Sequence, residues 1–345
     1  GKNWVRFTGN LPKVSIRDMV FQKRENDLVI GTHGRGVYII DDLSPLQSLS
    51  MDKLSQNLAF LDSRPYKMGY NYGMGGSTGD DGFWGSNPSN SVMITYYMKK
   101  RHIFGDMSLD IFDPNGDLIK TLPAGKRKGI NIVKWQMRME KPKVPSSVQL
   151  LGNAMVGPEY PPGEYTVRIV KNKDTINGNV KVEYYENPYH SAADRDLRHK
   201  VLMEAYDMLE DLAYLDNTIK EIRDQSSQKS DSLSGSLAKK LNTLNEQMTK
   251  LRSKLLATKQ GRITGEERLR ERLGDIYGGV MGYDGKPTKS QIEGLEELKL
   301  QKQGMESTIS IIINDDLPYL NKKIEKAGLR PISITDRLEF EKVKL

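Results

Sequence analysis

The sequence predicts a multidomain protein of the β plus α class, and three observations lead to this fold class. Short runs of alternating apolar residues, separated by glycine, asparagine and proline turns, occupy residues 1–60 and 92–187. Residues 61–91 between them are rich in glycine and aromatic residues. From residue 188 onward, apolar residues recur every three or four positions, as they do in amphipathic helices. We therefore expect two β-sheet regions, joined by a linker loop, and a C-terminal helical bundle.

Length and composition restrict this interpretation. The 345 residues are enough for about two or three domains, and 37% hydrophobic with 28% charged residues is ordinary for a globular protein. The sequence has no cysteine, which excludes disulfides, thiolate metal sites and thiol catalysis. No segment reaches the ~18 consecutive apolar residues of a membrane-spanning helix. We expect no membrane span.

Residues 1–60 are expected to form three short antiparallel strands, whose apolar residues are Val14, Ile16, Met19 and Phe21, then Leu28, Val29 and Ile30, then Val37, Tyr38, Ile39 and Ile40. Gly34-Arg35-Gly36 provides a tight turn between the last two strands. A sheet this small leaves its edges open and cannot bury a core alone. We expect its partners to lie outside these residues, in a segment that precedes Gly1.

Several motifs in this region occur in a recognisable order. They are Trp4-Val5-Arg6-Phe7, Asn10-Leu11-Pro12, Ile16-Arg17-Asp18, the run from Asp27 to Val37, and Asp41-Asp42-Leu43 with Pro45-Leu46. Together they resemble the last blade of the large BNR/sortilin-like β-propeller proteins, a family usually named glycosyl hydrolases. The resemblance implies that residues 1–60 are one blade of an incomplete ring. It also implies that the upstream propeller segment, or a complementary chain, is the partner. The resemblance further implies a location outside the cytoplasm of a bacterium: in the periplasm, at the outer-membrane surface or secreted.

Residues 61–91 form the expected linker loop, and Phe83 and Trp84 are its most notable aromatic residues. A loop of this length is usually functional or disordered. Its aromatic side chains would either bind a glycan or pin the loop to the propeller. We favour the pin, because burial is the commoner fate of aromatic side chains.

Residues 92–187 predict a β-sandwich of six or seven short strands. The alternating residues of its strands include Val92, Ile94 and Tyr96, Met107, Leu109 and Ile111, Tyr165, Val167 and Ile169, and Val180 and Val182. The order of Asp110 to Gly116, Gly129-Ile130-Asn131, Val133-Lys134-Trp135 and Pro161-Pro162-Gly163-Glu164-Tyr165 resembles the FlgD-like Ig module of secreted bacterial proteins. This resemblance implies an Ig-like fold and little about chemistry.

Residues 188–345 predict three long helices and a short one. One apolar stripe runs from Leu197 to Ile222, a second from Leu237 to Leu255, and a third from Leu295 to Leu320, which Pro318 should kink or end. The short helix is expected near Glu266–Leu273, and Thr264 and Thr288 fit capping boxes. A free-standing coiled-coil dimer is the alternative. The short connections favour an intramolecular bundle.

The candidate ligand-binding residues of the first region are His33 and Arg35, on a turn bounded by glycines. They could bind an anionic sugar or transfer a proton, but we favour a role in holding the blade to its neighbour. Asp41 and Asp42 are adjacent on a strand, so they point to opposite faces and cannot form the carboxyl pair of a glycosidase alone. Histidine spacing and acidic loops fit no metal site, and we expect no cofactor and no catalytic residues in this segment.

The net charge of +7 is confined mainly to residues 1–187, which hold 25 basic against 19 acidic residues. The densest basic runs are Lys99-Lys100-Arg101 and Lys126-Arg127-Lys128. Neither is interleaved with aromatic residues, so we expect no nucleic-acid partner.

Two hypotheses for function remain. In the first, the chain is a non-catalytic scaffold of a secreted or cell-surface propeller protein and contacts a surface protein complex or a glycan. In the second, the whole protein is a glycoside hydrolase whose catalytic carboxylates lie in the upstream propeller, although no Ser-x-Asp-x-Gly-x-Thr-Trp repeat occurs here.

Overall fold

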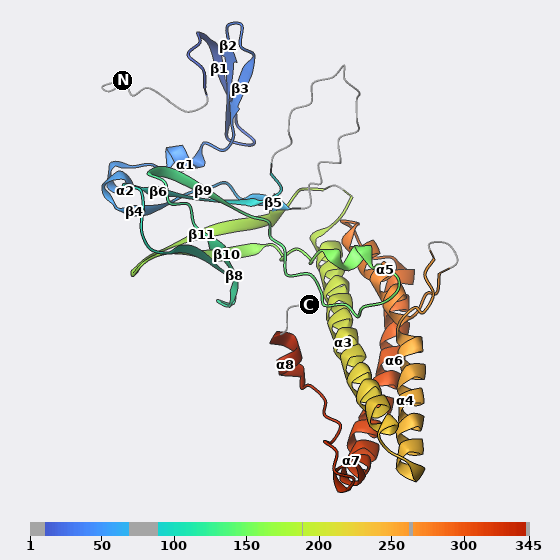
Figure 1. Ribbon diagram of the computed structural model, residues 1–345. Helices are drawn as coiled ribbons and strands as arrows, with labels where there is room; N and C mark the ends of the chain where they lie inside the picture. The colour runs from blue at the N-terminus through green and yellow to red at the C-terminus, as the bar shows by residue number, and fades with distance from the viewer. Residues whose placement is uncertain (1–10, 69–88, 188, 262–264, 343–345) are drawn as a thin grey trace. The chain divides into compact units, whose positions relative to one another are not determined.

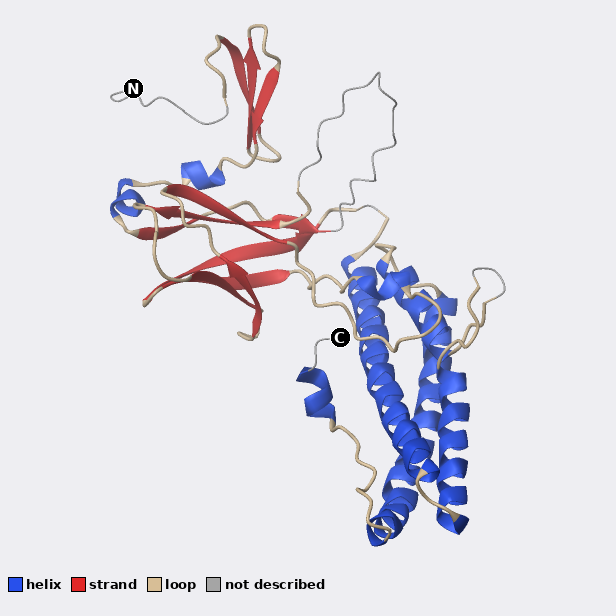
Figure 2. Ribbon diagram, in the orientation of Figure 1, coloured by secondary structure: helices blue, strands red, loops and turns tan. Residues whose placement is uncertain are grey.

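A computed structural model describes residues 11–68, 89–187, 189–261 and 265–342, and shows a protein with both β-sheets and α-helices (Figures 1 and 2). The chain divides into two compact units. The β unit contains the described residues up to Met137 together with Pro161–Glu186. The helical unit contains Arg138–Tyr160 and the described residues from Asn187 onward. The mixed β plus α class expected from the sequence is therefore confirmed.

The β unit begins with a three-stranded antiparallel sheet in the order β1-β2-β3. Its strands are β1 (Ile16–Gln22), β2 (Asp27–Thr32) and β3 (Val37–Ile40), as the apolar pattern predicts. Two short helices, α1 (Ser44–Gln47) and α2 (Met51–Ser55), follow β3. They connect this sheet to the rest of the unit.

The remaining strands of the β unit form two sheets, which we call the two-sheet layer pair. One sheet has the order β4-β6-β9, with β4 (Leu58–Leu61), β6 (Val92–Met98) and β9 (Gly129–Trp135). The other has the order β5-β11-β10-β7-β8, and its strands are β5 (Tyr66–Met68), β7 (Met107–Phe112), β8 (Leu118–Pro123), β10 (Gly163–Lys171) and β11 (Asp174–Tyr184).

The core of the layer pair lies between the two sheets. Alternate residues of β6, β7 and β10 are buried, because successive side chains of a strand point to opposite faces. Trp135 of β9 meets Tyr165 of β10 edge to face, with ring centroids 5.0 Å apart. Phe60 of β4 packs so closely against Gly178 of β11 that a Cβ there would collide with its ring. Both contacts join one sheet to the other.

The helical unit contains three long helices: α3 (Ala192–Asp231), α4 (Gly235–Leu255) and α6 (Lys289–Ile311). Shorter helices are α5 (Leu269–Met281), α7 (Leu317–Lys326) and α8 (Arg337–Lys342). Apolar residues of α3 to α7 meet in one cluster of buried residues. The expected capping box at Thr288 is present, with Gln291 as its partner.

Several helix boundaries differ from those expected. Helix α3 extends past Ile222, the last residue of its expected apolar stripe, and includes the polar residues 226–231. Before Pro318 the chain forms a π-helical turn, Ile312–Asp316, and α7 then starts with this proline near its first position. Proline has no backbone N–H to donate, and it follows a π-helical turn in which the Leu317 amide donates to the Ile312 carbonyl five residues earlier. Thr264 lies outside the described residues, and α5 begins at Leu269 with Arg268 as its N-cap.

The boundaries of the compact units also differ from the expected domains. Residues 58–68, divided between the first region and the linker 61–91, supply strands β4 and β5 to the two-sheet layer pair. Conversely, Arg138–Tyr160 lies between β9 and β10 in sequence but packs with the helices. In that segment Leu151 enters the helical core, and the Tyr277 hydroxyl donates to the Val156 carbonyl at 2.8 Å. Among the described residues, no helix is long and apolar enough to cross a membrane.

Candidate functional site

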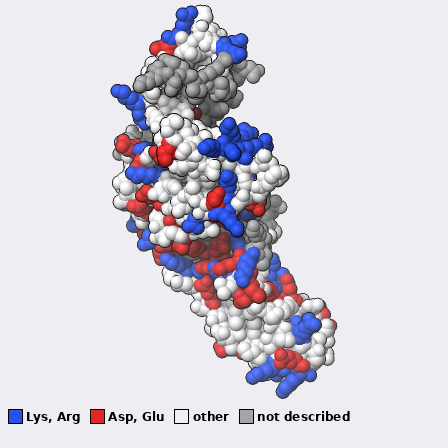
Figure 3. Space-filling view, turned by 90° about the vertical axis from the view of Figure 1, so that its left-hand side faces the viewer, with Lys and Arg blue, Asp and Glu red and all other residues white. Residues whose placement is uncertain are grey.

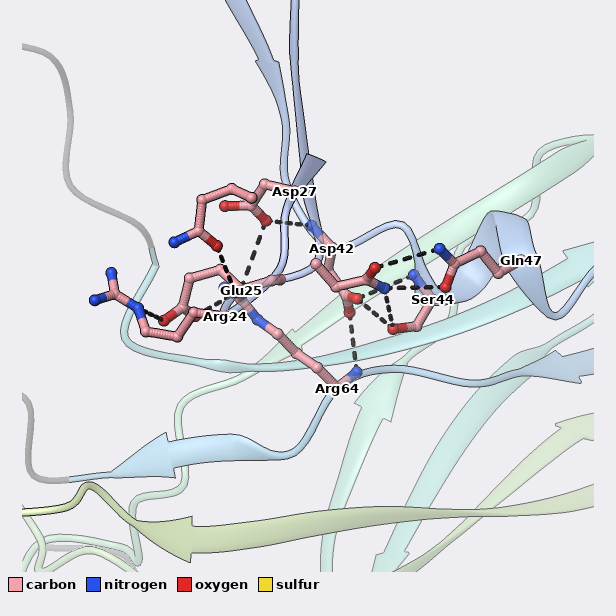
Figure 4. A network of polar contacts seen from close by, with 9 residues as sticks. Arg24, Glu25, Asp27, Asp42, Ser44, Gln47 and Arg64 are labelled. Atoms are coloured by element: carbon pink, nitrogen blue, oxygen red, sulfur yellow. Dashed lines mark hydrogen bonds and ion pairs between the residues drawn. The ribbon is translucent and has the colours of Figure 1, made fainter. Parts of the chain in front are cut away.

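A network of polar contacts joins the three-stranded sheet to the two-sheet layer pair (Figure 4). It brings together the turn between β1 and β2, the residues that follow β3, and the segment between β4 and β5. Asn26 and Asp42 both adopt positive φ, at +56° and +47°. Asparagine and aspartate tolerate this left-handed conformation better than other non-glycine residues, which explains their presence at the two bends.

Arg64 is the central cation of the network. Its Nη1 donates to the Glu25 carbonyl at 2.6 Å and to the Glu25 carboxylate at 2.8 Å, and lies 3.6 Å from Asp27 Oδ1. The arginine side chain is one-third exposed and that of Asp27 is 16% exposed. Such partly desolvated pairs interact more strongly than pairs on an open surface. Arg64 therefore fastens the β1–β2 turn to the segment before β5.

Asp42 is held on both of its carboxylate oxygens. Oδ1 accepts from the Ser44 amide at 3.1 Å and the Ser44 hydroxyl at 2.6 Å, and Oδ2 accepts from the Arg64 amide at 3.0 Å. The Asp42 amide itself donates to Asp27 Oδ1 at 2.9 Å. Because β3 ends at Ile40, Asp41 and Asp42 follow the strand instead of lying on it, which corrects the expected placement. Asp42 is thus a turn residue with a structural role.

A cavity of about 310 Å³ opens beside this network, and Asp41, Arg64, Lys67, Asn90 and Tyr185 are among the residues that line it. Partial burial raises the pKa of the Asp41 carboxyl, the negative charge of Asp27 raises it further, and Arg64 opposes both. The volume lies at the lower limit for small-molecule sites. Hydroxyl-rich or carboxylate-bearing small molecules match such a mixed polar lining.

The carboxyl groups near the cavity do not form a catalytic pair. Glu25 also lines it but is held by Arg64, and Asp42 is held by three donors. Of the three lining carboxyl groups, Glu25 forms ion pairs with described residues, whereas Asp41 and Asp42 form none. Hydrolysis of a glycosidic bond needs two facing carboxyl groups with separate tasks. Within the described residues, no group of three or more acidic or histidine side chains is placed to hold a metal ion.

The structure places His33 and Arg35 on the exposed β2–β3 turn, away from the cavity. His33 Nδ1 lies 3.3 Å from Arg17 Nη2, and its amide donates to the Ser15 carbonyl at 2.9 Å. Gly34 and Gly36 both have positive φ, at +74° and +75°, so their expected geometric role is confirmed. Phe83 and Trp84 lie outside the described residues.

Sequence reasoning did not single out Arg64, Glu25 or Asp27, which form the centre of the network. Arg64 lies within the segment read as a linker, and an isolated arginine between polar residues carries no spacing signal. Two pairs of turn-forming residues, Asn26-Asp27 and Asp41-Asp42, were the features of the sequence that could have indicated this network. The strand register places both pairs at the same end of the small sheet.

The two faces of the three-stranded sheet form a second candidate surface. The register pairs Phe21 with Leu28 and Leu28 with Ile40 on one face, and Val20 with Val29 and Val29 with Ile39 on the other. The most exposed apolar residues of the sheet are Met19 60%, Val20 55%, Phe21 57%, Val37 65% and Ile39 58%. Both faces are therefore apolar and open within the described residues, whereas an ordinary surface sheet has one polar face.

Comparisons with known proteins give little for this chain. No family model matches the sequence, and no curated protein matches it. Among solved structures, a point mutant of Salmonella alpha-2-macroglobulin is similar, with 11% identity and a TM-score of 0.22, over 48% of this chain and 9% of that one. The same protein reacted with methylamine is similar at 12% identity, with a TM-score of 0.21, over 47% of this chain and 9% of that one. Likeness at this level carries no argument about fold or function.

Proposed function

We propose that this chain is the non-catalytic, C-terminal scaffold portion of a secreted or cell-surface bacterial β-propeller protein. In this proposal the β1–β3 sheet is the last blade of the ring, the two-sheet layer pair is an Ig-like module, and the helical unit is a bundle that offers further surface to partners. The proposal rests on the motif order in the first 46 residues and on the apolar character of both faces of the sheet.

The observation that carries the proposal is the pair of open apolar faces. A propeller blade packs between two neighbouring blades, so both of its faces must be apolar. Phe21 and Met19 lie on one face and Val37 and Ile39 on the other, as such packing requires. The Arg64 network supports a scaffold role, since it ties this sheet to the next module through ion pairs.

An Ig-like assignment of the layer pair has its own support. The Tyr165 hydroxyl donates to the Pro161 carbonyl four residues upstream, and the ring packs on buried Trp135. A tyrosine bonded to upstream backbone and a buried tryptophan are both hallmarks of Ig-like sandwiches. The Pro161-Pro162-Gly163-Glu164-Tyr165 motif thereby gains a physical explanation.

The experiment is an assembly assay between this chain and the upstream portion of the full-length protein, expressed as a separate polypeptide. We expect the two to copurify. Phe21→Asp and Val37→Asp, which put a charge on opposite faces, should each weaken assembly by more than about 3 kcal/mol, because an unpaired charge would be buried. The matched control is Leu118→Asp, at a residue 56% exposed on β8. Absence of a complex, or equal loss in the control, would refute the proposal.

A separate assay tests the non-catalytic role. The full-length protein should not cleave a panel of oligosaccharides. Cleavage that disappears when inward-facing Asp or Glu residues of the upstream propeller are changed would replace the scaffold proposal with a glycoside hydrolase, whose two carboxyl groups would then be located.

A further inference from the structure

The fold gathers the two basic runs of the sequence at one end of the two-sheet layer pair. Met98 at the end of β6 pairs with Gly129 at the start of β9, so Lys99-Lys100-Arg101 and Lys126-Arg127-Lys128 extend from neighbouring strands. The His102 amide donates to the Lys126 carbonyl at 3.0 Å. The β10–β11 turn lies at the same end, because Lys171 pairs with Met107 at the start of β7.

We call residues 99–106, 124–128 and 171–174 the basic loop cluster. These loops contain eight Lys or Arg residues and only two acidic residues, Asp106 and Asp174. Their net charge of +6 equals the whole excess of residues 1–187, so the fold concentrates a charge that looks scattered in the sequence. Figure 3 turns this end of the layer pair toward the viewer and shows Lys and Arg side chains gathered there.

The cations of the cluster face solvent without acidic partners. Within the described residues, none of the ion pairs involves a Lys or Arg of these loops. Lys126 Nζ donates to the Gly105 carbonyl at 2.8 Å and Lys99 Nζ to the Ser55 carbonyl at 3.0 Å. These bonds hold the loops in place and leave the positive charges uncompensated.

Two large apolar side chains project from the middle of the cluster. Ile103 is 69% exposed and Phe104 is 84% exposed, although the adjacent His102 is buried and anchors the loop. Soluble proteins show single exposed apolar residues routinely, but adjacent large ones mark interaction sites when polar residues rim them. Here the rim is cationic.

We propose that the basic loop cluster docks on an anionic lipid bilayer, with Ile103 and Phe104 inserted at the level of the headgroups. Lipid phosphates would neutralise the Lys and Arg side chains, and the apolar pair would leave water for the boundary between headgroups and acyl chains. A soluble polyanion such as a nucleic acid would pair with the cations and leave these two side chains in water. The combination of exposed cations and a projecting apolar pair therefore favours a bilayer.

The test is cosedimentation of the full chain with two kinds of vesicle: phosphatidylcholine alone, and an equal mixture of phosphatidylcholine and phosphatidylglycerol. We expect binding to the anionic vesicles alone, and weaker binding as salt concentration rises. Lys100→Gln/Arg127→Gln should reduce the affinity roughly 25-fold, at about fivefold for each cation removed. Ile103→Ser/Phe104→Ser should reduce it about tenfold with the charge unchanged.

Matched controls lie on the helical unit. Lys239→Gln/Lys250→Gln removes the same charge from exposed positions of α4, and Leu300→Ser removes a side chain that is 68% exposed on α6. Both should bind as the unchanged chain does. Equal binding to neutral vesicles, equal losses in the controls, or capture by heparin without any vesicle binding would each overturn the proposal. These outcomes are independent of the assembly assay, since the basic loop cluster lies outside the β1–β3 sheet.

Discussion

The pair Arg270–Glu271 in α5 gives a sharp prediction about the stability of the helical unit. Both side chains are almost fully buried, at 3% and 4% exposed, and Arg270 Nη1 donates to Glu271 Oε1 at 2.7 Å. Glu271 Oε2 also accepts from the Ala257 amide at 3.1 Å and the Arg268 amide at 3.3 Å. Besides Glu271, Arg270 contacts the Gln149 carbonyl at 3.2 Å. Apart from the bond that joins the pair, the Glu271 carboxylate therefore has two hydrogen-bond partners and the Arg270 guanidinium has one.

Glu271→Ala should destabilise the helical unit by about 3–5 kcal/mol, because it leaves a buried guanidinium charge without its counter-charge. For a unit of this size, that loss corresponds to a fall of about 6–20 °C in the thermal midpoint. Arg270→Met should cost only about 1–3 kcal/mol, since the carboxylate keeps its two amide donors. Thermal unfolding followed by circular dichroism at a helix-sensitive wavelength measures both.

The control for this prediction is the exposed pair Arg272–Glu297, in which Arg272 is also on α5. Its side chains are 36% and 58% exposed at a distance of 3.1 Å. Glu297→Ala should lower the midpoint by no more than about 4 °C, because an exposed pair contributes at most about 1 kcal/mol. If Glu271→Ala behaves like Glu297→Ala, or costs less than Arg270→Met, the argument from burial is wrong.

Three further predictions concern pH and packing. Burial raises the pKa of Asp41, so the ionised carboxylate opposes folding. Asp41→Asn should therefore raise the thermal midpoint at pH 7. This gain in the midpoint should vanish below the ordinary pKa of an aspartate, where the carboxyl is protonated in both the folded and the unfolded state. Hydrogen bonds from Thr258 lower the pKa of Glu266 to about 2. The ionised Glu266 therefore stabilises the fold fully above the unfolded pKa of about 4.3, and this stabilisation is lost as the pH falls toward 2. Hydrogen exchange of the Thr258 amide, measured over that pH range, would detect the loss. Gly274→Ala should destabilise the helical unit by about 1–3 kcal/mol in chemical denaturation, because a Cβ at Gly274 would collide with Leu151. The loss is expected even though alanine favours a helix more than glycine does. An unchanged free energy of unfolding would mean that Leu151 can move away.

Local periodicity predicted most elements because their side chains meet the core along one regular face. The stripe from Leu197 to Ile222 lies within α3, and the alternation in Val92, Ile94 and Tyr96 lies within β6. Strands β4 and β5 were not predicted, since four and three residues are too few to display a period. Their strand state comes from pairing with β6 and β11, which is non-local information.

The basic loop cluster and the Arg64 network also depend on contacts between residues that are distant in the sequence. The proximity of the two basic runs depends on the register between β6 and β9. Sequence gives the charge of each run but not the distance between them. Likewise the Asp41-Asp42 motif is visible in the sequence, yet the partner that defines its role, Arg64, is supplied by the chain beyond two short helices.

The segment Arg138–Tyr160 determines where a helical fragment can be cut. Residues 188–345 contain helices α3 to α8, and we expect them to be helical when expressed alone. That fragment lacks Leu151, which packs in the helical core. It also lacks two hydrogen bonds: the one from the Tyr277 hydroxyl to the Val156 carbonyl, and the one from the Lys143 amide to the Glu210 carboxylate. Burial of one leucine contributes about 2 kcal/mol and each hydrogen bond about 1 kcal/mol, so the fragment should melt well below the helical transition of the full chain. A synthetic peptide of residues 138–160 should raise the melting temperature of the fragment, whereas a peptide with Leu151→Ala should raise it less. A fragment that is as stable as the full chain would show that this segment only passes over the helices and does not support them.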